Sequence, residues 1–144
     1  MANSAILREV TLTLPMLPDM EIAASKTATA MAEYMKMGSD KIDEVRMAVV
    51  EACINSFEHS HANDRKVYIT FAVLGDEEPE RLQISIHDTG VGFRPERVEV
   101  PKIEEKLKAA RKRGWGLKII EGLMDEVDIQ SSVDGTTIVM SKMR

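Results

Sequence analysis

The sequence has 144 residues, a length that fits one domain with a single core and leaves little room for two. Its net charge of −5 argues against a general nucleic-acid binder, because such proteins neutralise phosphates with a basic surface. No apolar segment approaches the length that crosses a bilayer, and no charged-then-apolar leader is present. The single cysteine, Cys53, cannot form an intramolecular disulfide and has apolar neighbours. We therefore expect one cytoplasmic domain, residues 1–144, without a membrane segment and with a buried, unreactive Cys53.

Hydrophobic periodicity predicts the elements in chain order. They are a strand at 6–14, a helix at 20–37, a second helix that follows a cap at 39 or 40 and runs to about 59, strands at 66–74 and 81–87, a short helix from 117, and strands at 127–133 and 136–143. Ser39 or Asp40 is suited to cap the second helix. The charged, proline-containing segment 93–113 is interpreted as a lid. This order predicts an α+β sandwich, in which three helices cover one face of a mixed, largely antiparallel sheet.

The segment that follows the strand at 81–87 reads D-T-G-V-G-F and begins with Asp88. Gly90 and Gly92 would let backbone N–H groups approach an anion, while a fixed Asp88 carboxylate could accept a hydrogen bond from an exocyclic amine such as that of adenine. A turn or a β-bulge explains an isolated D-x-G-x-G equally well. The other motifs of the chain favour the purine site.

The second predicted helix carries Glu51, Asn55 and Glu58 within a sector of roughly 60°, turned away from its apolar stripe. A solvated helix face is the simplest explanation. In the alternative explanation these residues have separate chemical roles. Asn55 would offer a neutral oxygen to Mg²⁺, which retains waters and is completed by substrate phosphates. Glu51, one turn earlier, could act as a general base towards an attacking hydroxyl or water.

Phosphate contacts are predicted near the short helix that starts at Leu117. Gly114 and Gly116 precede it, so their N–H groups and the helix N-terminus could hold phosphates, and Arg113 is the nearest cation. Thr136, on the last strand, could hydrogen-bond adenine or an ordered water near Asp88. An ordinary turn, a solvated charge run and a strand threonine are the simpler explanations of these residues.

The three histidines, His59, His61 and His87, are interpreted as structural or surface residues, because no cysteine or carboxylate spacing completes a zinc site. A Ser-His-Asp arrangement is disfavoured because no G-x-S-x-G segment is present.

These motifs, in this order, resemble those of the GHKL ATPase superfamily, which includes histidine-kinase catalytic domains, and within it the bacterial anti-sigma factor serine/threonine kinases. The resemblance covers nearly the whole chain. The matching segments are E-x-x-x-N at Glu51 and Asn55, D-x-G-x-G from Asp88 to Gly92, G-x-G-L from Gly114 to Leu117, and G-T at Gly135 and Thr136.

The resemblance implies a Bergerat-type fold in which Glu51 is the catalytic base, Asn55 the Mg²⁺ ligand and Asp88 the adenine reader. The residues that would bind the phosphates of ATP are Gly90, Gly92, Arg113, Gly114, Gly116 and Leu117. Such kinases phosphorylate a small anti-sigma factor antagonist of the STAS type and bind a sigma factor, commonly as homodimers.

Three functional hypotheses remain open. The first is an ATP-dependent protein serine/threonine kinase that also sequesters a sigma factor, without direct nucleic-acid contact. The second is a nucleotide-regulated binding module that switches a signalling protein without phosphotransfer. The third, an ATPase part of a larger machine, ranks last because the chain has no room for a transducer domain.

Overall fold

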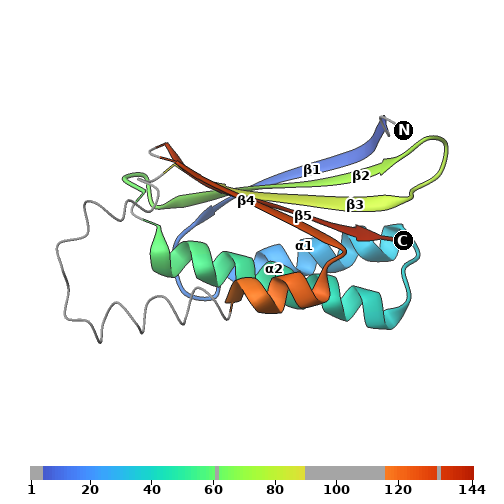
Figure 1. The fold of residues 1–144 in the computed structure, drawn as a ribbon, viewed down its shortest axis with the longest axis horizontal. Helices are drawn as coiled ribbons and strands as arrows, with labels where there is room; N and C mark the ends of the chain where they lie inside the picture. Colours follow the sequence, from blue (N-terminus) through green and yellow to red (C-terminus); the bar gives the residue numbers. More distant parts are fainter. Residues whose placement is uncertain (1–4, 61, 90–115, 133) are drawn as a thin grey trace.

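The computed structural model describes residues 5–60, 62–89, 116–132 and 134–144 (Figure 1). Its elements are β1 (Ala5–Pro15), α1 (Met20–Tyr34), α2 (Ser39–His59), β2 (Lys66–Gly75), β3 (Arg81–Asp88), an eight-residue helix at 116–123, β4 (Glu126–Ser132) and β5 (Gly135–Met143). Every predicted element is present, which confirms the α+β prediction. The predicted lid, 93–113, lies outside the described residues.

The strands form one five-stranded sheet in the order β1-β2-β3-β5-β4. All its described pairings are antiparallel, so the sheet is more uniform than the mixed, largely antiparallel one predicted. The predicted hairpin of β2 and β3 is confirmed by pairs such as Tyr68 with His87. The β4–β5 hairpin ends with Ser132 opposite Gly135, which places Gly135 at the start of β5.

The helices lie on one face of the sheet and the core fills the space between the two layers (Figure 1). Strict alternation along β3 buries Leu82, Ile84 and Ile86 towards the helices, as expected for a sheet with one covered face. From the helices come small and branched side chains at three- and four-residue spacing, including Val45, Val49 and the fully buried Cys53 of α2. The prediction of a buried Cys53 is confirmed.

The start of α2 differs in detail from the prediction. Its N-cap is Gly38, in an extended conformation and without a side-chain capping bond, whereas Ser39 is already the first helical residue. Neither Ser39 nor Asp40 therefore acts as the cap, because the chain enters the helix one residue earlier than their capping preference suggested.

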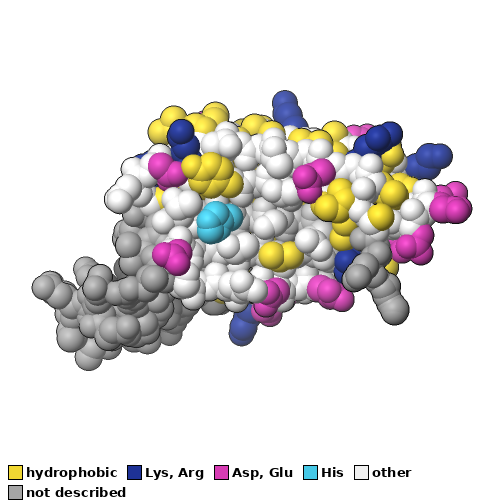
Figure 2. Space-filling view, turned by 90° about the horizontal axis from the view of Figure 1, so that it is seen from above, with side chains coloured by type: hydrophobic (Ala, Val, Ile, Leu, Met, Phe, Trp, Pro, Cys, Tyr) yellow, Lys and Arg dark blue, Asp and Glu magenta, His cyan; other side chains and the backbone are white. Residues whose placement is uncertain are grey.

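The opposite face of the sheet carries no helix in the described part of the chain. Figure 2 shows this face, where uncharged polar side chains and backbone fill much of the surface. The described helices include none that is both long and apolar enough to cross a membrane.

Candidate functional site

The sheet places Asp88 and Thr136 side by side on its helix-covered face. Asp88 continues the buried alternation of β3 by one more step after Ile86, so its side chain points inwards although it is charged. It is only 4% exposed. Thr136 of β5 is its cross-strand partner in the antiparallel ladder, and partners directly opposite each other share a face. The structure therefore places these two residues side by side, and their predicted roles in binding stay predictions.

The C-terminal half of α2 faces the same place. Asn55 and Ser56 lie one turn before His59, and all three line a cavity of about 210 Å³ between α2 and the sheet. The helix at 116–123 contributes Leu117 to its wall. The full lining is Asn55, Ser56, His59, Ser60, Asp88, Leu117, Ile129, Ser131, Thr136 and Ile138.

This cavity has the chemistry of a site for a flat, partly polar ring. Apolar walls come from Leu117, Ile129 and Ile138, and the buried Asp88 carboxylate supplies an acceptor. The volume lies below the range of about 300–1,000 Å³ that is usual for complete ligand pockets. The described cavity therefore fits a purine base, and the rest of a nucleotide would have to extend beyond it.

Gly135 allows β5 to approach Asp88 closely. Its φ is +131°, and an ideal Cβ at this position would lie 1.9 Å from the Asp88 carbonyl oxygen and 3.0 Å from the Cα of Thr89. Any side chain would collide with the backbone that holds Asp88, so the position requires glycine. The sequence marks this glycine only as part of a G-T pair, and the reason for it becomes visible in the three-dimensional structure.

Glu51 lies beside the start of the helix at 116–123. Its Oε2 is 3.9 Å from an ideal Cβ built on Gly116. Both Glu51 and Asn55 are partly buried, whereas Glu58 is exposed, so the simple explanation of a solvated helix face holds for Glu58 alone. Glu51 is not among the residues that line the cavity; it lies one turn of α2 before Asn55.

The structure therefore assembles part of the predicted site. Asn55, Asp88, Leu117 and Thr136 share one cavity, and Glu51 and Gly116 meet next to it. The remaining predicted contacts fall outside the described residues, namely Gly90, Gly92, Arg113 and Gly114.

Several lining residues are absent from the predicted site. His59, interpreted from the sequence as structural or surface, lines the cavity and is mostly buried, with a side chain that is 19% exposed. Its position four residues after Asn55 places it on the same helix face, and this spacing is a signal that the sequence contained. Ile129 and Ser131 of β4 carry no such signal, because they reach the site only through pairing of β4 with β5.

The side chains near the site fit a metal ion that is held partly by waters and phosphates better than one held by protein side chains alone. The described residues contain no group of three or more His, Cys, Asp or Glu side chains that could hold a metal ion. Asn55 offers a single amide oxygen, which fits Mg²⁺ because this ion is commonly completed by waters and substrate phosphates.

Cys53 lies two residues before Asn55 on α2 but is fully buried and does not line the cavity. Burial, together with the charge of Glu21, raises the pKa of its thiol to about 12, so the thiol is protonated and unreactive at neutral pH.

The sequence was compared with protein families and with known proteins. Residues 14–142 match the histidine kinase-like ATPase domain. The chain is 33% identical over 127 residues to the anti-sigma F factor of Clostridium acetobutylicum, covering 85% of this chain and 84% of that protein. It is 30% identical over 135 residues to the serine-protein kinase RsbW of Oceanobacillus iheyensis, covering 90% and 82%.

Among solved structures, the RsbU and RsbW domains of a Mycobacterium tuberculosis protein match with a TM-score of 0.69 at 19% identity. This match covers 94% of the present chain and 32% of that longer chain. At this identity it supports the fold alone.

Proposed function

The chain belongs to the family of histidine kinase-like ATPase domains, and we propose that it is an ATP-dependent protein serine/threonine kinase that also acts as an anti-sigma factor. Its substrate would be a serine or threonine of a small STAS-type antagonist, and its second partner a sigma factor. The names and extents of the relatives support this proposal, because anti-sigma F factors and serine-protein kinases match most of the chain.

One observation carries the nucleotide-binding part of the proposal. Four predicted site residues from different elements, Asn55, Asp88, Leu117 and Thr136, line a single cavity whose size fits a purine. In this arrangement the Asp88 carboxylate would accept a hydrogen bond from the exocyclic amine of adenine, with Thr136 beside it. The phosphates would extend towards Gly116, at the start of a helix whose first N–H groups have no partner within the helix and could bind an anion.

The phosphotransfer part depends on Glu51. Its carboxylate lies next to Gly116, at the end of the site where the phosphates would extend. Glu51 would accept the proton of the substrate hydroxyl. At the same time the hydroxyl oxygen would bond to the γ-phosphorus of ATP, and the bond between this phosphorus and the leaving oxygen of ADP would break. Asn55 would contribute its amide oxygen to Mg²⁺, and the bound ion would neutralise charge on the phosphates. Gly90, Gly92, Arg113 and Gly114 would add phosphate contacts.

The family setting suggests further features of the proposed activity. The domain would extend over residues 1–144 with a lid at about 93–113, and the protein would act as a homodimer. Because sigma factors work on the transcription machinery, the kinase would meet its partners in the cytoplasm.

The proposal is tested by separating binding from transfer. Trp115, the only tryptophan, immediately precedes Gly116, so its fluorescence can follow ATP with and without Mg²⁺. Wild-type protein should give a saturable, Mg²⁺-dependent change and should phosphorylate its STAS-type antagonist. Glu51→Ala should retain ATP binding but lose phosphotransfer by about 10²–10⁴-fold, the usual contribution of a general base.

Glu33→Ala provides the control, because Glu33 is an exposed glutamate of the neighbouring helix α1 and does not line the cavity. It should transfer phosphate at the wild-type rate. A Glu51→Ala protein that phosphorylates the antagonist normally would remove Glu51 from the mechanism. Normal ATP binding by the wild type without transfer to its antagonist would favour a nucleotide-regulated switch module instead.

A further inference from the structure

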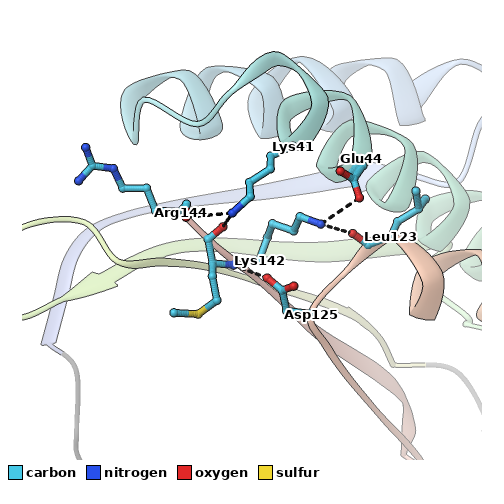
Figure 3. Close-up of polar contacts among 7 residues, drawn as sticks. Lys41, Glu44, Leu123, Asp125, Lys142 and Arg144 are labelled. Atoms are coloured by element: carbon cyan, nitrogen blue, oxygen red, sulfur yellow. Dashed lines mark hydrogen bonds and ion pairs between the residues drawn. The ribbon is translucent and has the colours of Figure 1, made fainter.

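A buried lysine joins three elements behind the candidate site. Lys142 of β5 is 6% exposed and lies on the inner face of the sheet. Its Nζ donates to the Leu123 carbonyl at 2.5 Å and pairs with Glu44 Oε2 of α2 at 3.1 Å (Figure 3). Neither the predicted site nor the proposed phosphotransfer step uses this lysine.

The two contacts fix the end of the helix at 116–123. Leu123 is its last residue, and its carbonyl is one of those that have no partner within a helix. A cation at this end is also favoured by the helix dipole. The chain that follows is held to the same strand, because the Met143 N–H donates to Asp125 Oδ2 at 2.6 Å.

The N-terminal end of this helix, at Gly116, lies beside Glu51 of α2. Its C-terminal end, at Leu123, is linked through Lys142 to Glu44, which also belongs to α2. Glu44 and Glu51 are seven residues apart, which places them on one face of α2 about 10 Å from each other. Eight residues of helix span about 12 Å, nearly the same length. The helix at 116–123 thus runs alongside α2 in the opposite direction, with Gly116 next to Glu51 and Leu123 tied through Lys142 to Glu44.

We propose that Lys142 is a positioning residue that sets the axial position of the helix at 116–123 along α2 and so aligns Gly116 with Glu51. The catalytic part of this inference rests on the proposed kinase function. Glu51 must reach a hydroxyl attacking a phosphate held at Gly116, and a misplacement of about 1 Å can cost about 100-fold in rate. Removing Lys142 leaves the residues of the site intact but releases the far end of the helix.

Lys142→Met tests this role, because methionine keeps much of the aliphatic stem and loses the charge. Glu44→Gln is the second variant. The Glu44 side chain is 37% exposed, so this exchange should leave folding intact even if Lys142→Met does not. Lys41→Met is the matched control: Lys41 also joins α2 to β5 and the residue after it, but its Nζ donates to the backbone oxygens of Met143 and Arg144 and not to the helix at 116–123 (Figure 3).

The expected results are local. Hydrogen–deuterium exchange of amides 116–123 should accelerate in Lys142→Met and Glu44→Gln, while β3 amides exchange as in wild type and Lys41→Met changes neither. In Lys142→Met, kcat for phosphotransfer should fall about 10- to 100-fold, and the Kd for ADP should change much less.

Two outcomes would overturn the inference. One is unchanged exchange at 116–123 in both variants. The other is faster exchange that is uniform across β3 and this helix, with kcat falling only in step with stability. If the wild-type protein transfers no phosphate, the proposed function fails, and the exchange measurement still decides whether Lys142 positions the helix.

Discussion

Replacing Gly135 by alanine probes how the sheet holds Asp88. The added methyl would stand 1.9 Å from the Asp88 carbonyl oxygen and 2.9 Å from its carbonyl carbon, so β5 and the end of β3 must move apart. The φ of +131° adds backbone strain of about 1–3 kcal/mol for a residue with a Cβ. Together these effects predict a loss of about 3–4 kcal/mol in the free energy of unfolding.

The same displacement should weaken nucleotide binding. A hydrogen bond to a charged group contributes about 1.5–3 kcal/mol, so moving the Asp88 carboxylate out of place should raise the Kd for ATP about 10- to 100-fold. Thermal unfolding measures the first effect, as a fall in Tm of about 6–16 °C. Titration of Trp115 fluorescence with Mg²⁺ and ATP, at a temperature where the variant is folded, measures the second.

Gly122→Ala is the matched control for this experiment. An ideal Cβ at Gly122 meets nothing within 4 Å, and the residue lies in the helix at 116–123. Alanine there should stabilise the protein by about 0.5–1 kcal/mol and leave ATP binding unchanged. The reasoning is refuted if Gly135→Ala unfolds within about 1.4 kcal/mol of wild type, which is a tenfold change in the equilibrium constant, and binds ATP normally.

Two further predictions concern Asp88 and Cys53. Asp88→Asn should raise the Kd for ATP about 10- to 100-fold, measured by calorimetry; wild-type affinity would exclude Asp88 as the adenine acceptor. Because the pKa of Cys53 is raised from 9.0 to about 12, the thiol stays protonated in the folded protein while it ionises in the unfolded chain above pH 9. The free energy of unfolding should therefore fall as the pH rises above 9, with a slope that approaches about 1.4 kcal/mol per pH unit more than in Cys53→Ala. Parallel curves in urea unfolding would contradict this.

The sequence predicts the elements well because the periodicities are strong. Alternation at Leu82, Ile84 and Ile86 defines β3, and the same period of two continues to Asp88, so its inward direction is also readable. The distance at which β5 approaches Asp88 cannot be predicted from the sequence, because it depends on pairing between strands that are far apart in the chain. The role of Gly135 is therefore a structural finding.

The contacts of Lys142 also could not be predicted from the sequence. The alternation of Ile138 and Met140 along β5 puts position 142 on the buried face, where a lysine is unexpected. Pattern alone cannot supply its partner, because Glu44 lies 98 residues earlier in the chain. Burial of a lysine requires a paired carboxylate or carbonyl, and only the packing of α2 and the helix at 116–123 against the sheet brings both to it.

The two halves of the site are held by different kinds of interaction. Asp88 and Thr136 are fixed by the backbone ladder between β3 and β5, which a side-chain change leaves in place unless it collides with the backbone, as at Gly135. Gly116 and Glu51 lie on two helices whose relative position depends on side chains, among them the contacts of Lys142. Substitutions near the ladder should therefore act mainly on nucleotide affinity, and substitutions between the helices mainly on the rate of transfer. If Glu51 is the base, as proposed, such a protein can hold its nucleotide firmly while the alignment of the base depends on a few side-chain contacts.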